Sequence, residues 1–189
     1  MTPIVQNATD ILSFFTLLAD VLAIFLFVLA TTSLRDRGWG KRVGAFFGKY
    51  AVLFSFIIAV GGVVGSLFYS EFAHFRPCLL CWIERGFLYT DAVIFIVAML
   101  ARKEEHVRLY GNFVRNCAIV LSSAGFLVSA YHSYLQLGGS SFIDCSAVGV
   151  SCEYVYFMEY GYITIPIMAL TAFALVILFM VFHKRNSGI

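Results

Sequence analysis

Long apolar segments constrain this chain more than any other feature. A helix needs roughly 20 apolar residues to cross a bilayer, and its backbone groups must be hydrogen-bonded within the segment. Five segments meet this length: 11–34, 50–69, 82–101, 111–137 and 162–182. The chain is 61% hydrophobic and only 13% charged, and a water-soluble fold has too little interior to bury so many apolar side chains. The sequence therefore predicts an all-α integral membrane protein with five transmembrane helices.

The first segment, 11–34, has an alternative interpretation as a cleaved signal peptide. It lacks a positive n-region, is longer than the usual apolar core of roughly 7–15 residues and ends in charges rather than small residues. We therefore expect a retained helix. Asp20 inside it marks either an internal polar contact or a loosely seated segment, and no role is assigned to it. In the second segment, three glycines predict close helix packing: Gly61, Gly62 and Gly65.

The basic residues predict how the chain is oriented. Eleven of the 13 Lys and Arg residues lie in three stretches, 35–49, 102–115 and 184–185. Positive charge marks cytoplasmic loops, which predicts that these stretches and the C-terminus face the cytoplasm. The N-terminus, the 70–81 connection and the 138–161 loop are then outside.

Four of the five cysteines fall on the outer side, where disulfides persist: Cys78, Cys81, Cys145 and Cys152. Four cysteines allow three pairings, and the spacing favours Cys78–Cys81 and Cys145–Cys152. A Cys-x-x-Cys ring is too small to contribute much loop-entropy stabilisation. We therefore interpret the first pair as redox-active or metal-binding. Cys117, in the inner part of the fourth segment, is expected to be a small buried apolar residue.

Two charges follow the Cys-x-x-Cys pair inside an apolar run. Cys81 is expected at the first turn of the third helix, where the helix dipole lowers a thiol pKa. Arg85 lies one turn further along and would favour the thiolate. Glu84 and Arg85 are expected to offset one another, either for this purpose or as an interfacial ion pair. His132 is expected near the outer end of the fourth helix as a site residue or a structural hydrogen-bonding residue.

Four motifs together resemble the DsbB family of bacterial membrane thiol:quinone oxidoreductases, and more narrowly its BdbC-type members with a short second loop. The motifs are PCLLCWIER (77–85), YHSYLQL (131–137), an outer loop with two cysteines and GYITIP (161–166). The resemblance covers residues 50–183 and implies a four-helix transmembrane bundle. The helix at 11–34 has no counterpart there. We therefore expect an additional N-terminal helix with a cytoplasmic linker in 1–45 and the DsbB-like domain in 46–189.

The resemblance implies roles for the residues beside the quinone. Cys78 and Cys81 match the pair next to it, with Cys81 the sulfur that reacts with the ring. Arg85 matches the arginine that contacts the quinone, and His132 matches a histidine near the same site. The quinone is expected to be ubiquinone or menaquinone, and no metal is expected.

The resemblance also implies the partner and the relay. Cys145 and Cys152 match the pair that exchanges with a DsbA- or BdbD-like thioredoxin-fold protein outside the cytoplasm, and Cys145 is expected to form the mixed disulfide. Electrons would pass from this pair to Cys78 and Cys81 and then to the quinone. The location implied is the bacterial cytoplasmic (inner) membrane, with contacts to lipid and quinone and none to nucleic acid.

Three other classes of protein would account for parts of this pattern. Vitamin K epoxide reductase-like proteins also use four helices, two cysteine pairs and quinones, but their loop pair precedes the Cys-x-x-Cys pair. A metal-binding membrane protein would hold zinc with four cysteines, for which Cys145-x6-Cys152 is a poor spacing. A scaffold with structural disulfides leaves the charged Cys-x-x-Cys helix unexplained. Haem attachment is excluded because Trp82 stands where Cys-x-x-Cys-His requires histidine.

Overall fold

The computed structural model of the 189-residue chain describes residues 2–32, 38–100, 107–141 and 150–186. These residues form six α-helices and one π-helical turn, and they contain no strand. The helices are α1 (Pro3–Thr31), α2 (Gly38–Lys49), α3 (Ala51–Leu67), α4 (Leu79–Leu100), α5 (Val107–Gln136) and α6 (Ile165–Asn186), and the π-helical turn η2 (Phe68–Phe72) continues α3. The all-α prediction is confirmed.

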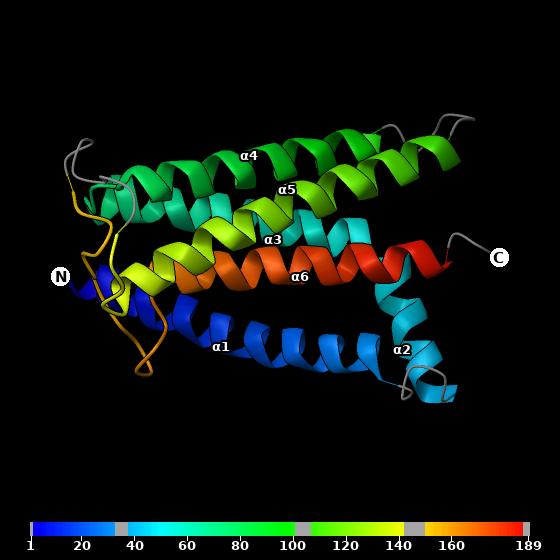
Figure 1. Ribbon diagram of the computed structural model, residues 1–189, viewed down its shortest axis with the longest axis horizontal. Helices are drawn as coiled ribbons and strands as arrows, with labels where there is room; N and C mark the ends of the chain where they lie inside the picture. The colour runs from blue at the N-terminus through cyan, green and yellow to red at the C-terminus, as the bar shows by residue number, and fades with distance from the viewer. Residues whose placement is uncertain (1, 33–37, 101–106, 142–149, 187–189) are drawn as a thin grey trace.

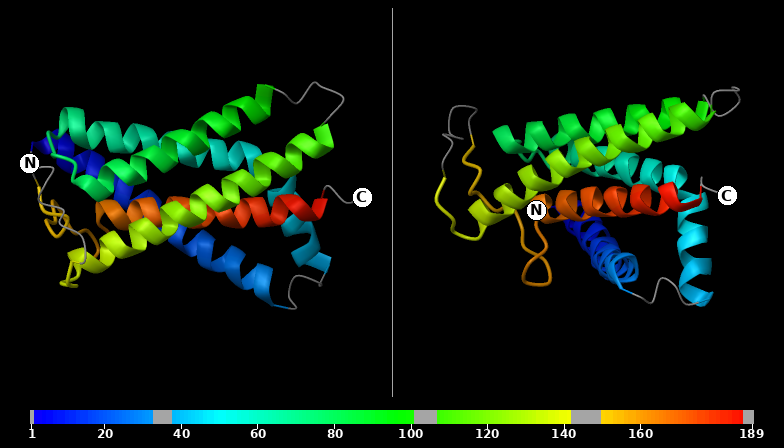
Figure 2. Two further views of the ribbon diagram at one scale, coloured as in Figure 1. Left: turned by 45° about the horizontal axis from the view of Figure 1, so that its top comes forward. Right: turned by 45° about the vertical axis from the view of Figure 1, so that its right-hand side comes forward.

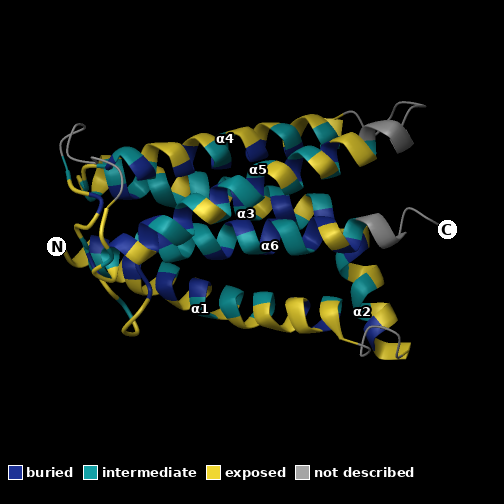
Figure 3. Cartoon of the chain, viewed as in Figure 1, coloured by how far each residue is buried: buried dark blue, intermediate teal, exposed yellow. Residues whose placement is uncertain are grey.

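Helix α6 is the centre of the bundle. It packs against α1, α2, α3 and α5, and α5 crosses it diagonally (Figure 2). Buried residues gather along α6, whereas the outer side of α1 is mostly exposed (Figure 3). A helix that is apolar on every side can be buried on every side, and the sequence of α6 carries no charge between Ile165 and Phe182. Its buried side chains include Phe173, Leu175, Val176, Phe179 and Met180.

Four helices in the described parts of the chain are long and apolar enough to cross a membrane: Pro3–Thr31, Ala51–Phe72, Gly111–Gln136 and Ile165–His183. Helix α4, which corresponds to the expected third span, is not among them. It carries Glu84, Arg85 and Asp91, and all three are buried inside the bundle. Five spans therefore remain a prediction. The N-terminus lies at the same end of the bundle as the start of α4, and the C-terminus lies at the other end (Figure 1).

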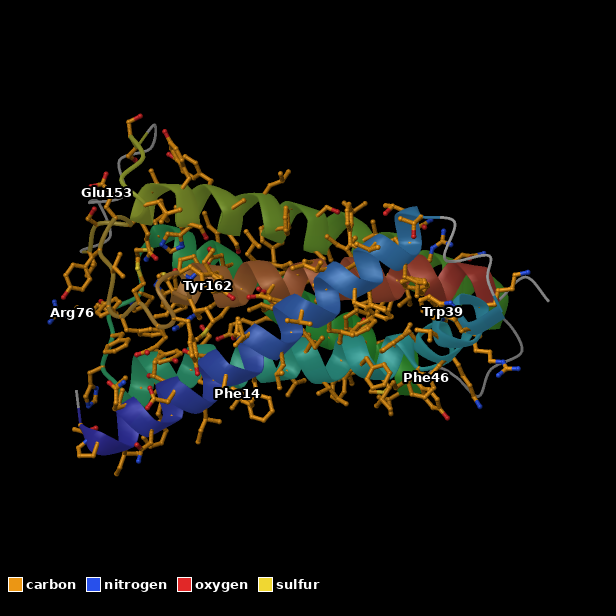
Figure 4. The ribbon with its side chains drawn as sticks, turned by 90° about the horizontal axis from the view of Figure 1, so that it is seen from below. Phe14, Trp39, Phe46, Arg76, Glu153 and Tyr162 are labelled. Atoms are coloured by element: carbon orange, nitrogen blue, oxygen red, sulfur yellow. The ribbon has the colours of Figure 1, made fainter. Side chains whose placement is uncertain are left out.

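A cytoplasmic linker was expected after the first span, within residues 1–45, but residues Gly38–Lys49 form the helix α2. It lies across the end of the bundle that is remote from the N-terminus (Figure 1). Two aromatic side chains on it are exposed, Trp39 at 45% and Phe46 at 52% (Figure 4). Lys41 and Arg42 are exposed as well. Exposed aromatic and basic residues on one short helix are typical of a helix that lies in a membrane interface.

Two aspartates within the helices make polar contacts with neighbouring helices. Asp20 of α1 accepts hydrogen bonds from the Tyr162 hydroxyl at 2.8 Å and from Thr171 Oγ1 of α6 at 2.5 Å. In the other half of the bundle, Ser122 of α5 donates to Asp91 of α4 at 2.7 Å. Asp20 thus makes an internal polar contact, which was one of the two interpretations open for it.

Candidate functional site

The Cys-x-x-Cys pair lies at the N-terminus of α4. Cys78 directly precedes the first helical residue, and its carbonyl accepts from the Trp82 N–H at 3.2 Å. Its Sγ accepts from the Cys81 N–H at 3.4 Å, so Cys78 is the N-cap residue with sulfur in the place of the usual oxygen. Both cysteines are free thiols, and their Sγ atoms are 3.0 Å apart. Because an S–S bond is about 2.05 Å long, an approach of about 1 Å would close the disulfide.

A buried polar chain leads from Cys78 into the bundle. His132 of α5 places Nε2 3.6 Å from Cys78 Sγ and Nδ1 3.0 Å from Oε1 of Glu84 on α4. The exposed fractions of Cys78, His132 and Glu84 are 3%, 1% and 3%. The Glu84 carboxylate accepts the Nδ1 hydrogen, so Nε2 faces the sulfur. A thiol beside a histidine that a carboxylate orients is a general arrangement for activating a nucleophile.

Hydrogen bonds around the reduced pair favour a negative charge on Cys78. The hydrogen bond from the Cys81 thiol, helped by His132, outweighs the cost of burial and lowers the pKa of Cys78. The sequence predicts the thiolate on Cys81 instead, whereas the hydrogen bonds that surround the pair favour it on Cys78. The reason is that α4 begins at Leu79 rather than near Trp82, so the N-cap position falls on Cys78 and Cys81 becomes a donor within the first turn.

Arg85 is fixed by the neighbouring helix. Its Nε donates to Ser66 Oγ at 2.6 Å and its Nη2 donates to the Ser66 carbonyl at 2.8 Å. The guanidinium also lies over the Trp82 ring, 5.2 Å from its centroid. The expectation that Glu84 and Arg85 offset one another is wrong, because Glu84 pairs with His132 of α5 and Arg85 pairs with Ser66 of α3.

A cavity of about 270 Å³ lies between α1, α3, α4 and α6, with the two cysteines at one end. Glu84, Arg85 and His132 also line it. Its other lining residues are mostly apolar, and glycines of α3 widen it. A Cβ on Gly61 or Gly65 would meet no atom within 4 Å, whereas one on Gly62 would touch Leu88 at 3.3 Å. Of the three glycines expected at helix contacts, only Gly62 therefore serves close packing.

The second cysteine-bearing loop is held over the first one. The Tyr156 hydroxyl donates to the Arg76 carbonyl at 2.8 Å, and the Tyr156 ring stacks on Phe75 at 4.3 Å. Cys152 is disulfide-bonded and 1% exposed, and it belongs to the same buried cluster as Cys78. Cys145 lies outside the described residues, so its pairing with Cys152 stays a prediction. In this disulfide Cys152 offers no thiolate to a metal, which disfavours the four-cysteine zinc site.

Comparison with known proteins identifies the family. The sequence model described as "Disulfide bond formation protein DsbB" matches residues 48–183. The chain belongs to the DsbB family. It is 36% identical over 128 residues to the SPbeta prophage-derived disulfide bond formation protein B of Bacillus subtilis, covering 68% of this chain and 81% of the relative. It is 34% identical over 136 residues to disulfide bond formation protein C of the same organism, covering 71% and 92%. No solved structure matches it significantly.

Within this DsbB-family chain, the structure brings most of the sequence-predicted site residues together. Cys78, Cys81 and His132 are in contact, and Arg85 lines the same cavity. Two side-chain pairings of the site were not predicted from the sequence. The pairing of Glu84 with His132 spans 48 positions and the Arg85–Ser66 pairing spans 19. The buried charges on α4 signalled that partners must exist, but nothing in the sequence identified them.

Proposed function

We propose that this DsbB-family chain is a thiol:quinone oxidoreductase that oxidises a thioredoxin-fold dithiol partner outside the cytoplasm. One observation carries the proposal. The Cys78–Cys81 pair, 3.0 Å apart, lies between a loop disulfide at Cys152 and an apolar cavity. A dithiol pair with a disulfide on one side and an apolar binding space on the other is suited to pass electrons from a protein to a lipid-soluble acceptor. The names of the relatives, which refer to disulfide formation, support the first half of this role.

The cavity suits a quinone ring, either of ubiquinone or of menaquinone. Its volume of about 270 Å³ is near the lower end of the range for small-molecule sites, roughly 300–1,000 Å³. Gly61 and Gly65 leave space that any side chain would fill. When bound, a quinone would accept two electrons and two protons. Arg85, oriented by Ser66, would hold it by a hydrogen bond to a ring oxygen, which also favours developing negative charge there.

The chain's own residues would carry the thiol exchange that leads to this acceptor. A thiolate of the partner attacks the disulfide of Cys152, which we assign to a pair with Cys145, and forms a mixed disulfide at Cys145. The second partner thiol releases the mixed disulfide, so the partner loses two electrons and two protons. The loop thiolate then attacks the Cys78–Cys81 disulfide through an interloop disulfide, and the loop pair is reoxidised as Cys78 and Cys81 become thiols.

Four residues would stabilise the charge and transfer the proton at the end of this relay. The Cys78 thiolate is stabilised by the helix N-terminus and by His132. Glu84 orients His132 so that Nε2 exchanges a proton with the sulfur. Cys81 has an intermediate exposure and lines the cavity, which supports its role as the sulfur that faces the acceptor.

We also propose that α4 is a fifth span, with the cysteine end outside the cytoplasmic membrane of a bacterium. Its 22 residues extend about 33 Å at 1.5 Å per residue, enough for the hydrocarbon core. Glu84, Arg85 and Asp91 are buried among the helices, so none of them faces lipid. The basic connections then lie inside, as the positive-inside rule requires. Residues 1–45 form an addition to the DsbB-like domain in 46–189, and the family match begins at residue 48.

The proposal is tested by quinone reduction in detergent with a reduced thioredoxin-fold protein as electron donor. Cys81→Ser is expected to abolish turnover, and Cys117→Ser, which changes a free cysteine outside the site, is expected to leave it unchanged. Arg85→His is expected to weaken quinone use while the protein remains inserted. Undiminished turnover in Cys81→Ser would refute the scheme.

A metal-binding function is the second candidate, because one observation favours it. Single ligand atoms of Cys78, Cys81 and His132 lie within 4.8 Å of one another, and zinc sites with three protein ligands and an open position exist. Metal content and free thiols of the purified protein separate the two functions. Stoichiometric zinc that protects these two cysteines from alkylation would favour the metal. Metal-free protein that reduces a quinone would favour the oxidoreductase.

A further inference from the structure

Helix α1 contributes one wall of the cavity beside the cysteines, although it lies outside the part of the chain that matches the DsbB family. The family match covers residues 48–183, whereas α1 covers Pro3–Thr31. Four of its residues line the cavity: Leu12, Phe15, Thr16 and Ala19. Their spacing of three, four and seven positions places them on one face of the helix. One face of α1 therefore lines the cavity.

A polar anchor sets the position of this face. Asp20, the residue after Ala19, accepts hydrogen bonds from the Tyr162 hydroxyl and from Thr171 of α6. An acidic residue within a membrane segment is costly unless it has partners, so sliding or rotating α1 on α6 would be unfavourable. Helix α1 runs diagonally across α6 when the molecule is seen from below, and Tyr162 lies near the start of α6 (Figure 4). The anchor therefore keeps α1 beside the cavity.

The exposed residues of the cavity lining fall into two groups. Arg76, Ser151 and Tyr154 belong to the segments around the cysteines at the end of the bundle. Phe15 and Gly61 lie within the spans of α1 and α3, and Phe15 is 62% exposed. Two groups of exposed lining residues indicate two openings. One opening faces the loops, and the other faces the surroundings of the helices at membrane depth.

We infer that α1 forms the lateral wall of the acceptor site and that the isoprenoid tail of the quinone passes between Phe15 and Gly61 into the lipid. This inference rests on the proposed quinone-dependent function. The polar residues Arg85 and Cys81 line the cavity near its loop end, whereas Phe15 and Gly61 line it within the spans of α1 and α3. A quinone has a polar ring and a long hydrocarbon tail. Its ring matches the end of the cavity with Arg85 and Cys81, and its tail matches the apolar part beside α1 and α3. The loop opening is left for the protein partner.

Binding of two quinones to the full-length protein in lipid nanodiscs tests the inference. One has a long isoprenoid tail, and the other has the same ring and no tail. Gly61→Leu narrows the opening, and Gly86→Leu is the matched control, because Gly86 is exposed with the same empty space around it but does not line the cavity. Gly61→Leu is expected to weaken binding of the long-tailed quinone by roughly tenfold or more. This is the scale on which an apolar pocket distinguishes ligands that differ by a small apolar group. Binding of the tail-less quinone to Gly61→Leu is expected to be unchanged. Binding of both quinones to Gly86→Leu is expected to be unchanged as well.

A second measurement uses the unmodified protein. A quinone that carries a diazirine on its tail is expected to label the segment that contains Leu12–Ala19, and excess long-tailed quinone is expected to prevent the labelling. Equal weakening of both quinones by Gly61→Leu, or tail labelling confined to α5, would overturn the inference and leave the proposed function intact. If the wild-type protein neither binds nor reduces either quinone, the proposed function is refuted together with the inference.

Discussion

The Glu84–His132–Cys78 chain allows a quantitative prediction. Glu84→Gln keeps the shape of the side chain but replaces a charged acceptor by a neutral one, 3.0 Å from His132 Nδ1. A hydrogen bond to a charged group contributes about 1.5–3 kcal/mol and a neutral one about 0.5–1.5. The difference, about 1–1.5 kcal/mol, corresponds to about one pKa unit. Because Glu84 supports the histidine that stabilises the Cys78 thiolate, the substitution is expected to raise the pKa of Cys78 by up to about this amount.

Thiolate ultraviolet absorbance of the reduced protein, followed against pH, measures this shift. The pKa of Cys78 is lowered to about 4, so the wild-type thiolate persists at neutral pH and is lost only as the pH falls toward that value. In Glu84→Gln the loss is expected at higher pH by about one unit. Cys78→Ser identifies the titrating group.

Glu71→Gln is the matched control, because Glu71 is exposed and bonded to Ser70 at the surface. It is expected to leave the titration unchanged. A titration in Glu84→Gln that coincides with the wild type would show that the carboxylate does not act on the sulfur. A titration that disappears in Cys81→Ser but remains in Cys78→Ser would show that the charge was assigned to the wrong cysteine.

Three further predictions concern residues other than Glu84, His132 and Cys78. Asp20→Ala is expected to lower the free energy of unfolding by about 1–3 kcal/mol, because the hydrogen bonds from Tyr162 and from Thr171 of α6 are lost. Asp10→Ala, at an exposed position of the same helix, is expected to change it by less than about 0.5 kcal/mol; equal effects in thermal unfolding would contradict the anchor. Ser66→Ala is expected to raise the KM for quinone, since the guanidinium that lines the cavity loses a partner, and an unchanged KM would exclude a positioning role. In a Trp82→Phe background, Trp39 fluorescence is expected to be quenched by lipids brominated near the headgroup, and stronger quenching from the acyl ends would contradict an interfacial α2.

Hydropathy and charge were sufficient to predict the helical membrane class, because apolar length and charge position are properties of the sequence alone. The interface helix α2 was not predicted. Its segment is interrupted by Gly38, Gly40, Gly44 and Gly48, and glycine lowers helix propensity by about 1 kcal/mol per residue. Packing overrides that preference here, since Gly40 and Gly48 are buried and Gly44 lies close to Phe182, where a Cβ would be 3.4 Å from its ring.

The sequence predicted which residues belong to the site, but not which of them are hydrogen-bonded to one another. Spacing in the sequence brought Cys78 and Cys81 together, and the expected topology placed His132 on the same side of the membrane. The assignment of charge between the two sulfurs depended on where α4 begins, and helix ends are the least certain feature of a sequence-based prediction. The partner of Glu84 depended on the packing of α4 against α5, which no local pattern encodes.

The position of α2 has a consequence for where the enzyme can work. A helix with exposed Trp39 and Phe46 at the end remote from the cysteines would fix the depth of that end at one leaflet. A change in bilayer thickness would then alter the depth of the cysteine end, because the α2 end keeps its depth. In thick membranes the cysteine loops would sink below the headgroups and become less accessible to a soluble protein. Turnover should accordingly depend on acyl chain length, even when the quinone concentration is constant.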